Sequence, residues 1–176
     1  MSSINSEPTY NYHYCLDQSN ETPNTSFQSN LTVLLGSLSS KASQSYSFYN
    51  DTSNGIYGLF LCRGDVNSST CQSCVSYASQ DITSRCPSNR TATIWFDECM
   101  LRYSNSNFFG VEATSPGLLA WNIIGNTTSP DAANFGAQAL MNGLIEEALR
   151  TDMLFKAVLP TEARVAHFGP KLQYEV

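Results

Sequence analysis

The chain has 176 residues, a net charge of −6 and only nine lysines and arginines. This balance excludes nucleic-acid binding and adsorption to an anionic membrane, because both partners require clustered cations. No apolar run approaches the roughly 20 residues of a membrane-spanning helix, and the length suits one ordinary domain with a remainder.

The first predicted elements are a strand and an amphipathic helix. Residues 10–15 alternate aromatic and polar side chains, as a half-buried strand does. Thr25-Ser-Phe-Gln28 has the pattern of a capping box, which predicts a helix start. The apolar stripe of that helix, which we expect to pack on a sheet, consists of Phe27, Leu31, Leu34, Leu35, Leu38 and Ala42. Residues 43–55 are rich in Ser, Asn and Gly and are predicted to form a loop.

The next segment joins a strand at 56–62 to a second helix through a cluster of three cysteines. A second capping box, Ser69-x-x-Gln72, places the helix start between Cys62 and Cys71. The core-facing stripe of this helix consists of Cys71, Cys74, Val75, Ala78 and Ile82. Cys86-Pro87 ends the helix, and residues 91–96 and 99–103 are predicted strands. Two helices on a small antiparallel sheet make an α+β domain.

The six cysteines indicate a disulfide framework with fifteen possible pairings. A structural zinc site needs four ligands, usually in two close pairs, whereas Cys71-x-x-Cys74 is the one close pair here. His13 and His167 are isolated in the sequence, so we expect no metal and no cofactor. A redox pair at Cys71 and Cys74 remains an alternative.

Seven N-x-Ser/Thr sequons agree with the cysteines in indicating an oxidising, extracellular environment. The candidate glycosylation sites are Asn20, Asn24, Asn30, Asn50, Asn67, Asn89 and Asn126. Residues 1–8 have neither a basic start nor an apolar core and are not a signal peptide. We therefore expect that a leader was left out of this chain or that the gene model is truncated.

The C-terminal third resembles the beginning of a second, similar unit. Residues 104–129 have the composition of a linker, and residues 135–149 form an amphipathic pattern after Pro130. The pattern Leu34-Leu35-x-x-Leu38-x-x-x-Ala42 recurs as Leu140-Met141-x-x-Leu144-x-x-x-Ala148, an offset of 140 − 34 = 106 residues. Continuation of the repeat would place a cysteine near position 168, which is Phe168. A partial second unit without disulfides is therefore predicted.

Three further features have simpler interpretations than a functional site. Arg63-Gly-Asp65 is interpreted as a tight turn rather than an adhesion motif. Asp97 and Glu98 are neighbours on a strand and point to opposite faces, which makes them a poor acid/base pair. Tyr10, Tyr12 and Tyr14 are spaced to share one strand face, where they would line a carbohydrate surface or pack in the core.

From about Pro8 to Gly110 the chain resembles the plant ginkbilobin-homologous family, also called the stress-antifungal domain or domain of unknown function 26. The segments that carry the resemblance are Gly58-Leu-Phe-Leu-Cys62-Arg-Gly-Asp65, Cys71-Gln-Ser-Cys74 and Trp95-Phe-Asp-Glu-Cys99-Met-Leu-Arg-Tyr-Ser-Asn105. They are similar to the forms in cysteine-rich receptor-like kinases and cysteine-rich repeat secretory proteins, which usually carry two such domains in tandem.

The resemblance implies two helices packed on a five-stranded antiparallel sheet, followed here by a truncated second repeat that begins with a helix. The implied divisions are a first domain at 8–110, a linker at 111–129 and a partial second domain at 130–176. The resemblance also implies three disulfides: Cys15–Cys86, Cys62–Cys71 and Cys74–Cys99.

For function, the resemblance implies a non-enzymatic extracellular module of a receptor-like kinase or a secreted relative. It would contact an unidentified ligand or protein, with carbohydrate as one candidate, in stress or defence signalling. Ginkbilobin binds mannose through an Asn, an Arg and a Glu. The matching positions here are Leu16, Thr93 and Ser104, so no binding residue is assigned. The alternatives are a mannose-binding antifungal lectin and a thiol redox sensor.

Overall fold

The computed structural model describes residues 7–16, 24–111, 141–150, 155–158 and 165–168. They belong to two units, Met1–Phe109 and Gly110–Val176, which are described separately. The first unit contains, in chain order, β1 (Tyr10–Leu16), α1 (Thr25–Ala42), β2 (Phe48–Ser53), β3 (Ile56–Cys62), α2 (Ser68–Arg85), β4 (Thr91–Phe96) and β5 (Cys99–Ser104). The predicted α+β class, with two helices on a five-stranded antiparallel sheet, is confirmed.

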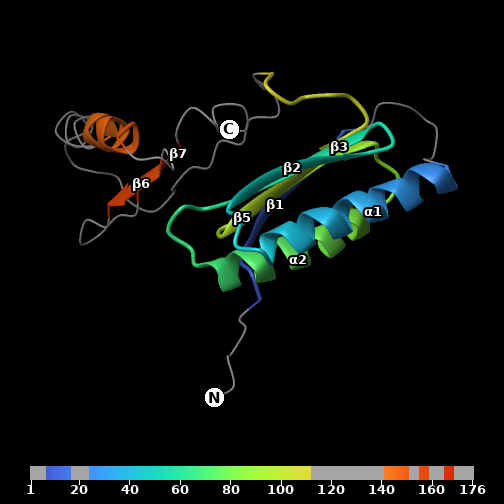
Figure 1. Ribbon diagram of the computed structural model, residues 1–176, viewed down its shortest axis with the longest axis horizontal. Helices are drawn as coiled ribbons and strands as arrows, with labels where there is room; N and C mark the ends of the chain where they lie inside the picture. Colours follow the sequence, from blue (N-terminus) through green and yellow to red (C-terminus); the bar gives the residue numbers. More distant parts are fainter. Residues whose placement is uncertain (1–6, 17–23, 112–140, 151–154, 159–164, 169–176) are drawn as a thin grey trace, which may run out of the picture. The chain divides into compact units, whose positions relative to one another are not determined.

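The sheet has the strand order β1-β4-β5-β3-β2, and every neighbouring pair is antiparallel. Figure 1 shows both helices on the same face of this sheet. Helix α1 packs mainly on β2 and β3, whereas α2 packs mainly on β4 and β5. The core between helices and sheet includes Phe60, Ile94 and Tyr103, which are completely buried.

The predicted apolar stripes of both helices face the core, as expected. In α1 all members are buried except Phe27, which is partly buried and packs against the same core. In α2 all five members of the stripe are buried. The helix axes are antiparallel, so the first turns of α1 lie beside the last turns of α2.

The predicted helix caps were wrong by one and two residues. The caps are Asn24 for α1 and Asn67 for α2, each with extended backbone angles. Asn24 Oδ1 accepts a hydrogen bond from the Phe27 N–H and Asn67 Oδ1 accepts one from the Thr70 N–H, both at 2.8 Å. Asparagine is at least as good an N-cap residue as serine or threonine, so Asn24 and Asn67 can take this role.

The prediction of a loop over residues 43–55 was also wrong, because the segment contains the edge strand β2. A polar composition is tolerated because β2 is at the edge of the sheet formed by the described strands and one face of β2 is exposed. It turns into β3 through Asn54 and Gly55, whose φ angles are +45° and +82°. An Asn-Gly pair with two positive φ angles forms a type I′ hairpin turn, and this was the sequence signal for the missed strand.

In the second unit, residues 141–148 are helical, and Leu144 and Ala148 of the predicted stripe are buried. A hairpin of β6 (Phe155–Val158) and β7 (Val165–Phe168) follows, in which Phe155 pairs with Phe168. This order of elements is that of α1, β2 and β3. The composition-based linker began too early at residue 104, because β5 includes Ser104 and the first unit extends to Phe109. The rest of the linker prediction, residues 112–129, and the helix prediction for 135–140 fall outside the described residues. None of the described helices is long and apolar enough to span a membrane.

Candidate functional site

Helix α2 and its C-cap residue together supply one cysteine to every disulfide. Cys71 and Cys74 lie in its first two turns and Cys86 is its C-cap residue. The bridges are Cys62–Cys71, Cys74–Cys99 and Cys15–Cys86, which are the pairs that the family resemblance implies. Cys71 and Cys74 therefore have different partners and do not form a redox pair. Among the described residues no cysteine is free, and no three metal-ligating side chains gather.

Beside Cys86, a cavity of about 260 Å³ lies between the start of α1 and the end of α2. Apolar groups from both helices and from β5 form much of its wall, and amide and hydroxyl groups complete it. The lining residues are Phe27, Gln28, Leu31, Thr32, Thr83, Cys86, Pro87, Asn89 and Tyr103. None of them carries a formal charge, so the cavity suits a neutral ligand with one apolar face and hydrogen-bonding groups.

Tyr103 connects this cavity to the core. Its hydroxyl donates a hydrogen bond to the Asn89 carbonyl oxygen at 3.1 Å, which fixes the chain where it leaves α2. Burial of the ring raises the pKa of Tyr103 above the ordinary value for tyrosine. The side chain therefore stays neutral at physiological pH and acts as a hydrogen-bond donor.

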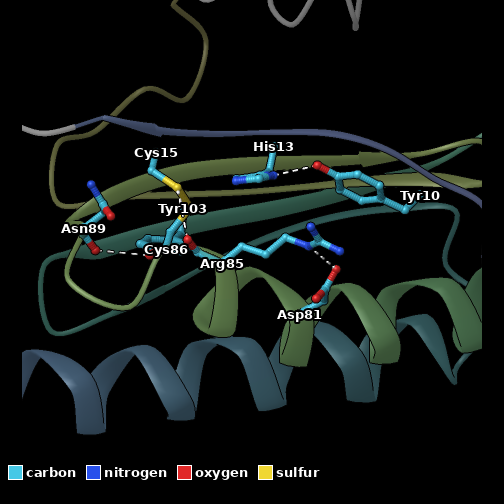
Figure 2. Close-up of a disulfide and its surroundings, with 8 residues drawn as sticks. All are labelled: Tyr10, His13, Cys15, Asp81, Arg85, Cys86, Asn89 and Tyr103. Carbon is cyan, nitrogen blue, oxygen red and sulfur yellow. Dashed lines mark hydrogen bonds and ion pairs between the residues drawn. A yellow bond between two sulfur atoms is a disulfide. The ribbon is translucent and has the colours of Figure 1, made fainter.

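A second polar cluster lies between the end of α2 and β1, as Figure 2 shows. The Arg85 guanidinium carbon lies 3.9 Å from the centre of the Tyr10 ring, and Arg85 Nε bonds Asp81 Oδ2 at 2.6 Å. The hydrogen bond to Asp81 raises the pKa of Arg85. Tyr10 also bonds His13 Nδ1 at 2.6 Å. These contacts hold β1 against α2 next to the Cys15–Cys86 bridge, and we assign them a structural role.

The three tyrosines of β1 do not share one face, contrary to the sequence-based expectation. A register shift between Tyr10 and Tyr12 turns Tyr10 toward the helices, where its ring contacts Phe96. Tyr12 stacks on Trp95 with 6.1 Å between ring centres. Tyr12 and Tyr14 therefore lie on the opposite, helix-free face of the sheet.

The positions that correspond to the family's sugar contacts are brought together on that helix-free face. Leu16 pairs with Thr91, which pairs with Ser104, and Thr93 lies two residues further along β4. The Thr91 and Ser104 hydroxyl groups are buried and bond each other at 2.9 Å. At Leu16, Thr93 and Ser104 the chain has an aliphatic side chain and two hydroxyl groups, where the family resemblance implies an amide, a cation and a carboxylate.

The remaining candidates are engaged in structural contacts. Residues 63–66 form the predicted tight turn, in which the Val66 N–H donates a hydrogen bond to the Arg63 carbonyl oxygen. Arg63 Nε also forms an ion pair with Asp65 Oδ1 at 2.5 Å. Asp97 Oδ1 accepts a hydrogen bond from Asn11 Nδ2, and Glu98 Oε2 accepts one from the Thr9 N–H. Both acids lie in the turn between β4 and β5, not on a strand as expected, and they hold the start of β1.

Five of the seven sequon asparagines are described, and Asn20 and Asn126 fall outside the described residues. Asn24, Asn50 and Asn67 are exposed, whereas Asn30 and Asn89 are partly buried. The sequence did not indicate the cavity, because its walls come from segments about 60 residues apart. The capping role of Asn24 and Asn67 could have been found, since each stands directly before its helix.

Comparison with known proteins identified a family and several relatives. Residues 14–106 match the family described as salt stress response/antifungal. Cysteine-rich receptor-like protein kinase 25 of Arabidopsis thaliana is 39% identical over 129 residues, which cover 69% of this chain and 19% of that protein. Cysteine-rich repeat secretory protein 1 of the same plant is 35% identical over 159 residues, which cover 88% and 46%. The chain thus spans between about a fifth and a half of the length of these relatives.

Among solved structures, the chain is similar to the tandem DUF26 ectodomain of the Arabidopsis thaliana cysteine-rich receptor-like protein PDLP8. The TM-score is 0.71 at 26% sequence identity, and the match covers 88% of this chain and 74% of that one.

Proposed function

Because the chain belongs to the salt stress response/antifungal family, we propose that it is a non-enzymatic, extracellular binding module that acts in stress or defence signalling. Its relatives include receptor-like kinases and secretory proteins. The observation that carries the extracellular assignment is the set of three disulfides, which use all six cysteines of the chain. Disulfides of this kind form and persist in oxidising compartments.

The cavity beside Cys86 is the ligand site in this proposal. It is close to the lower end of the size range of small-molecule pockets, and its uncharged lining favours a small, neutral, hydroxylated ligand. Its wall is fixed by the disulfide at Cys86 and by the hydrogen bond from Tyr103 to Asn89. A site with fixed walls loses little conformational entropy on binding, which increases the affinity for a small ligand.

The test is a ligand-observed NMR screen of the disulfide-intact chain with neutral monosaccharides and neutral hydroxylated aromatics. Thr32→Trp replaces an exposed residue that lines the cavity by a bulky one and should obstruct the cavity. The control is Val33→Trp, which changes the next residue of α1, also exposed but not part of the cavity lining. We expect a neutral probe to bind wild type and Val33→Trp but not Thr32→Trp. Equal binding to both variants would place the ligand elsewhere.

Two alternatives give different experimental results. A mannose-binding lectin would give a signal with mannose on a glycan array, which we do not expect because Leu16, Thr93 and Ser104 lack the charged groups of the family site. A thiol redox sensor would expose reactive thiols in its native state. Titration of the untreated, unfolded protein with a thiol reagent should find none.

We further propose that residues 130–176 are part of a second domain of the same kind. The offset of 106 residues carries β2 and β3 to positions 154–159 and 162–168, which contain β6 and β7. The helix at 141–148 buries Leu144 and Ala148, which correspond to Leu38 and Ala42 of α1. Hydrogen exchange should therefore show protection in 141–148, 155–158 and 165–168, and its absence there would contradict the proposal.

A further inference from the structure

Both helices of the first unit begin at a sequon asparagine, and we infer that Asn24 and Asn67 carry N-linked glycans while they cap α1 and α2. The inference rests on the proposed passage of the chain through the secretory pathway. The two sequons are Asn24-Thr-Ser26 and Asn67-Ser-Ser69. The structure provides a reason why the modification and the cap are compatible.

A helix cap and a glycan use different atoms of the same amide. Capping uses Oδ1, which accepts the hydrogen bonds from the Phe27 N–H and the Thr70 N–H at 2.8 Å. Glycosylation uses Nδ2, which is joined to the same carbon and therefore points away from the backbone donor. Both asparagines are exposed residues, which is compatible with a sugar on Nδ2.

The group transfer is chemically complete with one co-substrate, a lipid-diphosphate-linked oligosaccharide. The amide Nδ2 forms a bond to the anomeric carbon of the sugar, the bond from that carbon to the diphosphate oxygen breaks, and the lipid diphosphate leaves. One amide proton is released to a base of the transferase. The product is a secondary amide that keeps both lone pairs on Oδ1, so it still accepts the hydrogen bond that caps the helix.

Two of the other described sequons, at Asn50 and Asn89, provide internal references. Asn50 is exposed on the edge strand β2 and is the positive reference for passage through the secretory pathway. Asn89 is the negative reference, because it is partly buried and lines the cavity between the helices. A glycan at Asn89 would compete for space with the packing of α1 against the end of α2, so folded, secreted protein should lack it.

The consequence for the surface is that the two sugars stand at opposite ends of the helical layer. The helices are antiparallel, so their N-termini are far apart along the layer. Asn24 precedes the cavity-lining residue Phe27 by three residues, and its glycan borders the cavity mouth. Asn67 precedes Cys71 at the other end. The exposed surface of the helices between these positions remains free for a partner.

The test expresses the whole chain behind a leader peptide in a eukaryotic secretory host. Site occupancy in the secreted, folded fraction is measured by enzymatic release of the glycans in ¹⁸O-water and mass mapping of the peptides. We expect label at Asn24, Asn67 and Asn50 and none at Asn89. Label at Asn50 without label at Asn24 and Asn67 would overturn the inference and leave the extracellular proposal intact. Six free thiols and no label at any site would overturn both.

Matched variants separate the glycan from the cap at α2. Ser69→Ala and Asn67→Asp each remove the sequon but keep a capping oxygen, whereas Asn67→Ala removes both. We expect all three to lose the mass of one glycan. Only Asn67→Ala should lower the Tm of enzymatically deglycosylated protein, by roughly 4–8 °C. An equal fall in Tm for Ser69→Ala, or no loss of mass in any variant, would refute the inference.

Discussion

Gly58 lies where α1 packs tightly against β3, and its replacement by alanine tests this packing. A methyl carbon at this position would lie 2.9 Å from Leu34 Cδ2 and 3.1 Å from Leu38 Cδ1. Both leucines are almost completely buried. Inserting a methyl group into a core this tight forces side chains or backbone to move, at a typical cost of 1–3 kcal/mol, so we expect Gly58→Ala to lower the free energy of unfolding by about that amount.

Gly36, on the exposed side of α1, is the matched control. A methyl carbon there meets no atom within 4 Å, and glycine in a helix interior is less favourable than alanine. Gly36→Ala should therefore raise the free energy of unfolding by about 1 kcal/mol. Urea unfolding of the disulfide-intact chain, followed by circular dichroism, measures both changes.

A lower free energy of unfolding for Gly58→Ala together with a higher one for Gly36→Ala would support the packing of α1 on β3. If Gly58→Ala is as stable as wild type, the approach of α1 to β3 is looser than the structure shows. A third variant tests the mechanism of the loss. Leu34→Val removes Cδ2, the atom that would lie nearest to the added methyl carbon, so the cost of Gly58→Ala should be smaller in that background.

Three further predictions concern the turn, the disulfides and Tyr103. Gly55→Ala should lower the free energy of unfolding in urea by about 1 kcal/mol although the site is open, because φ is +82°. Replacing both cysteines of a bridge by serine should lower the free energy of unfolding in urea by an amount that increases with the length of the closed loop. On the loop-entropy relation the loss is about 4.4 kcal/mol for Cys15–Cys86, whose cysteines are 71 residues apart, and about 3.5 kcal/mol for Cys74–Cys99, at 25 residues. It is about 2.6 kcal/mol for Cys62–Cys71, at 9 residues. Tyr103→Phe should cost about 0.5–1.5 kcal/mol at neutral pH, because it removes the hydrogen bond from the Tyr103 hydroxyl to the Asn89 carbonyl. Burial raises the pKa of Tyr103, so as the pH rises the unfolded chain loses the Tyr103 hydroxyl proton before the folded chain does. Deprotonation of the unfolded state lowers the stability of the wild type only. The difference in unfolding free energy between wild type and Tyr103→Phe should therefore shrink above pH about 10 in urea titrations.

Much of the fold could be predicted because its elements are specified locally. The stripe from Leu31 to Ala42 has the helical period, and the strand at 56–62 lies between a glycine turn and the cysteine cluster. The strand β2 was missed because it is an edge strand with one exposed face, and such a strand can be polar. Its composition alone therefore indicated a loop. The Asn54-Gly55 pair carried the correct signal.

The candidate site was less predictable, because its parts are distant in the sequence. Nothing local in Phe27 or Thr83 shows that the two residues line the same cavity, since that depends on the antiparallel packing of α1 and α2. The register shift that separates Tyr10 from Tyr12 is likewise a property of the pairing of β1 with β4. Residue patterns can predict which side chains share an element but not how one element is placed against another.

The overlapping spans of the disulfides have a consequence for proteolysis. Cys15–Cys86 encloses every peptide bond from residue 15 to residue 86, and Cys74–Cys99 encloses those from 74 to 99. A protease that hydrolyses any one peptide bond between Cys15 and Cys99 therefore releases no fragment, and the two pieces remain joined by at least one bridge. Such a nicked molecule would gain only the mass of one water under non-reducing conditions, and it would separate into two pieces only after reduction.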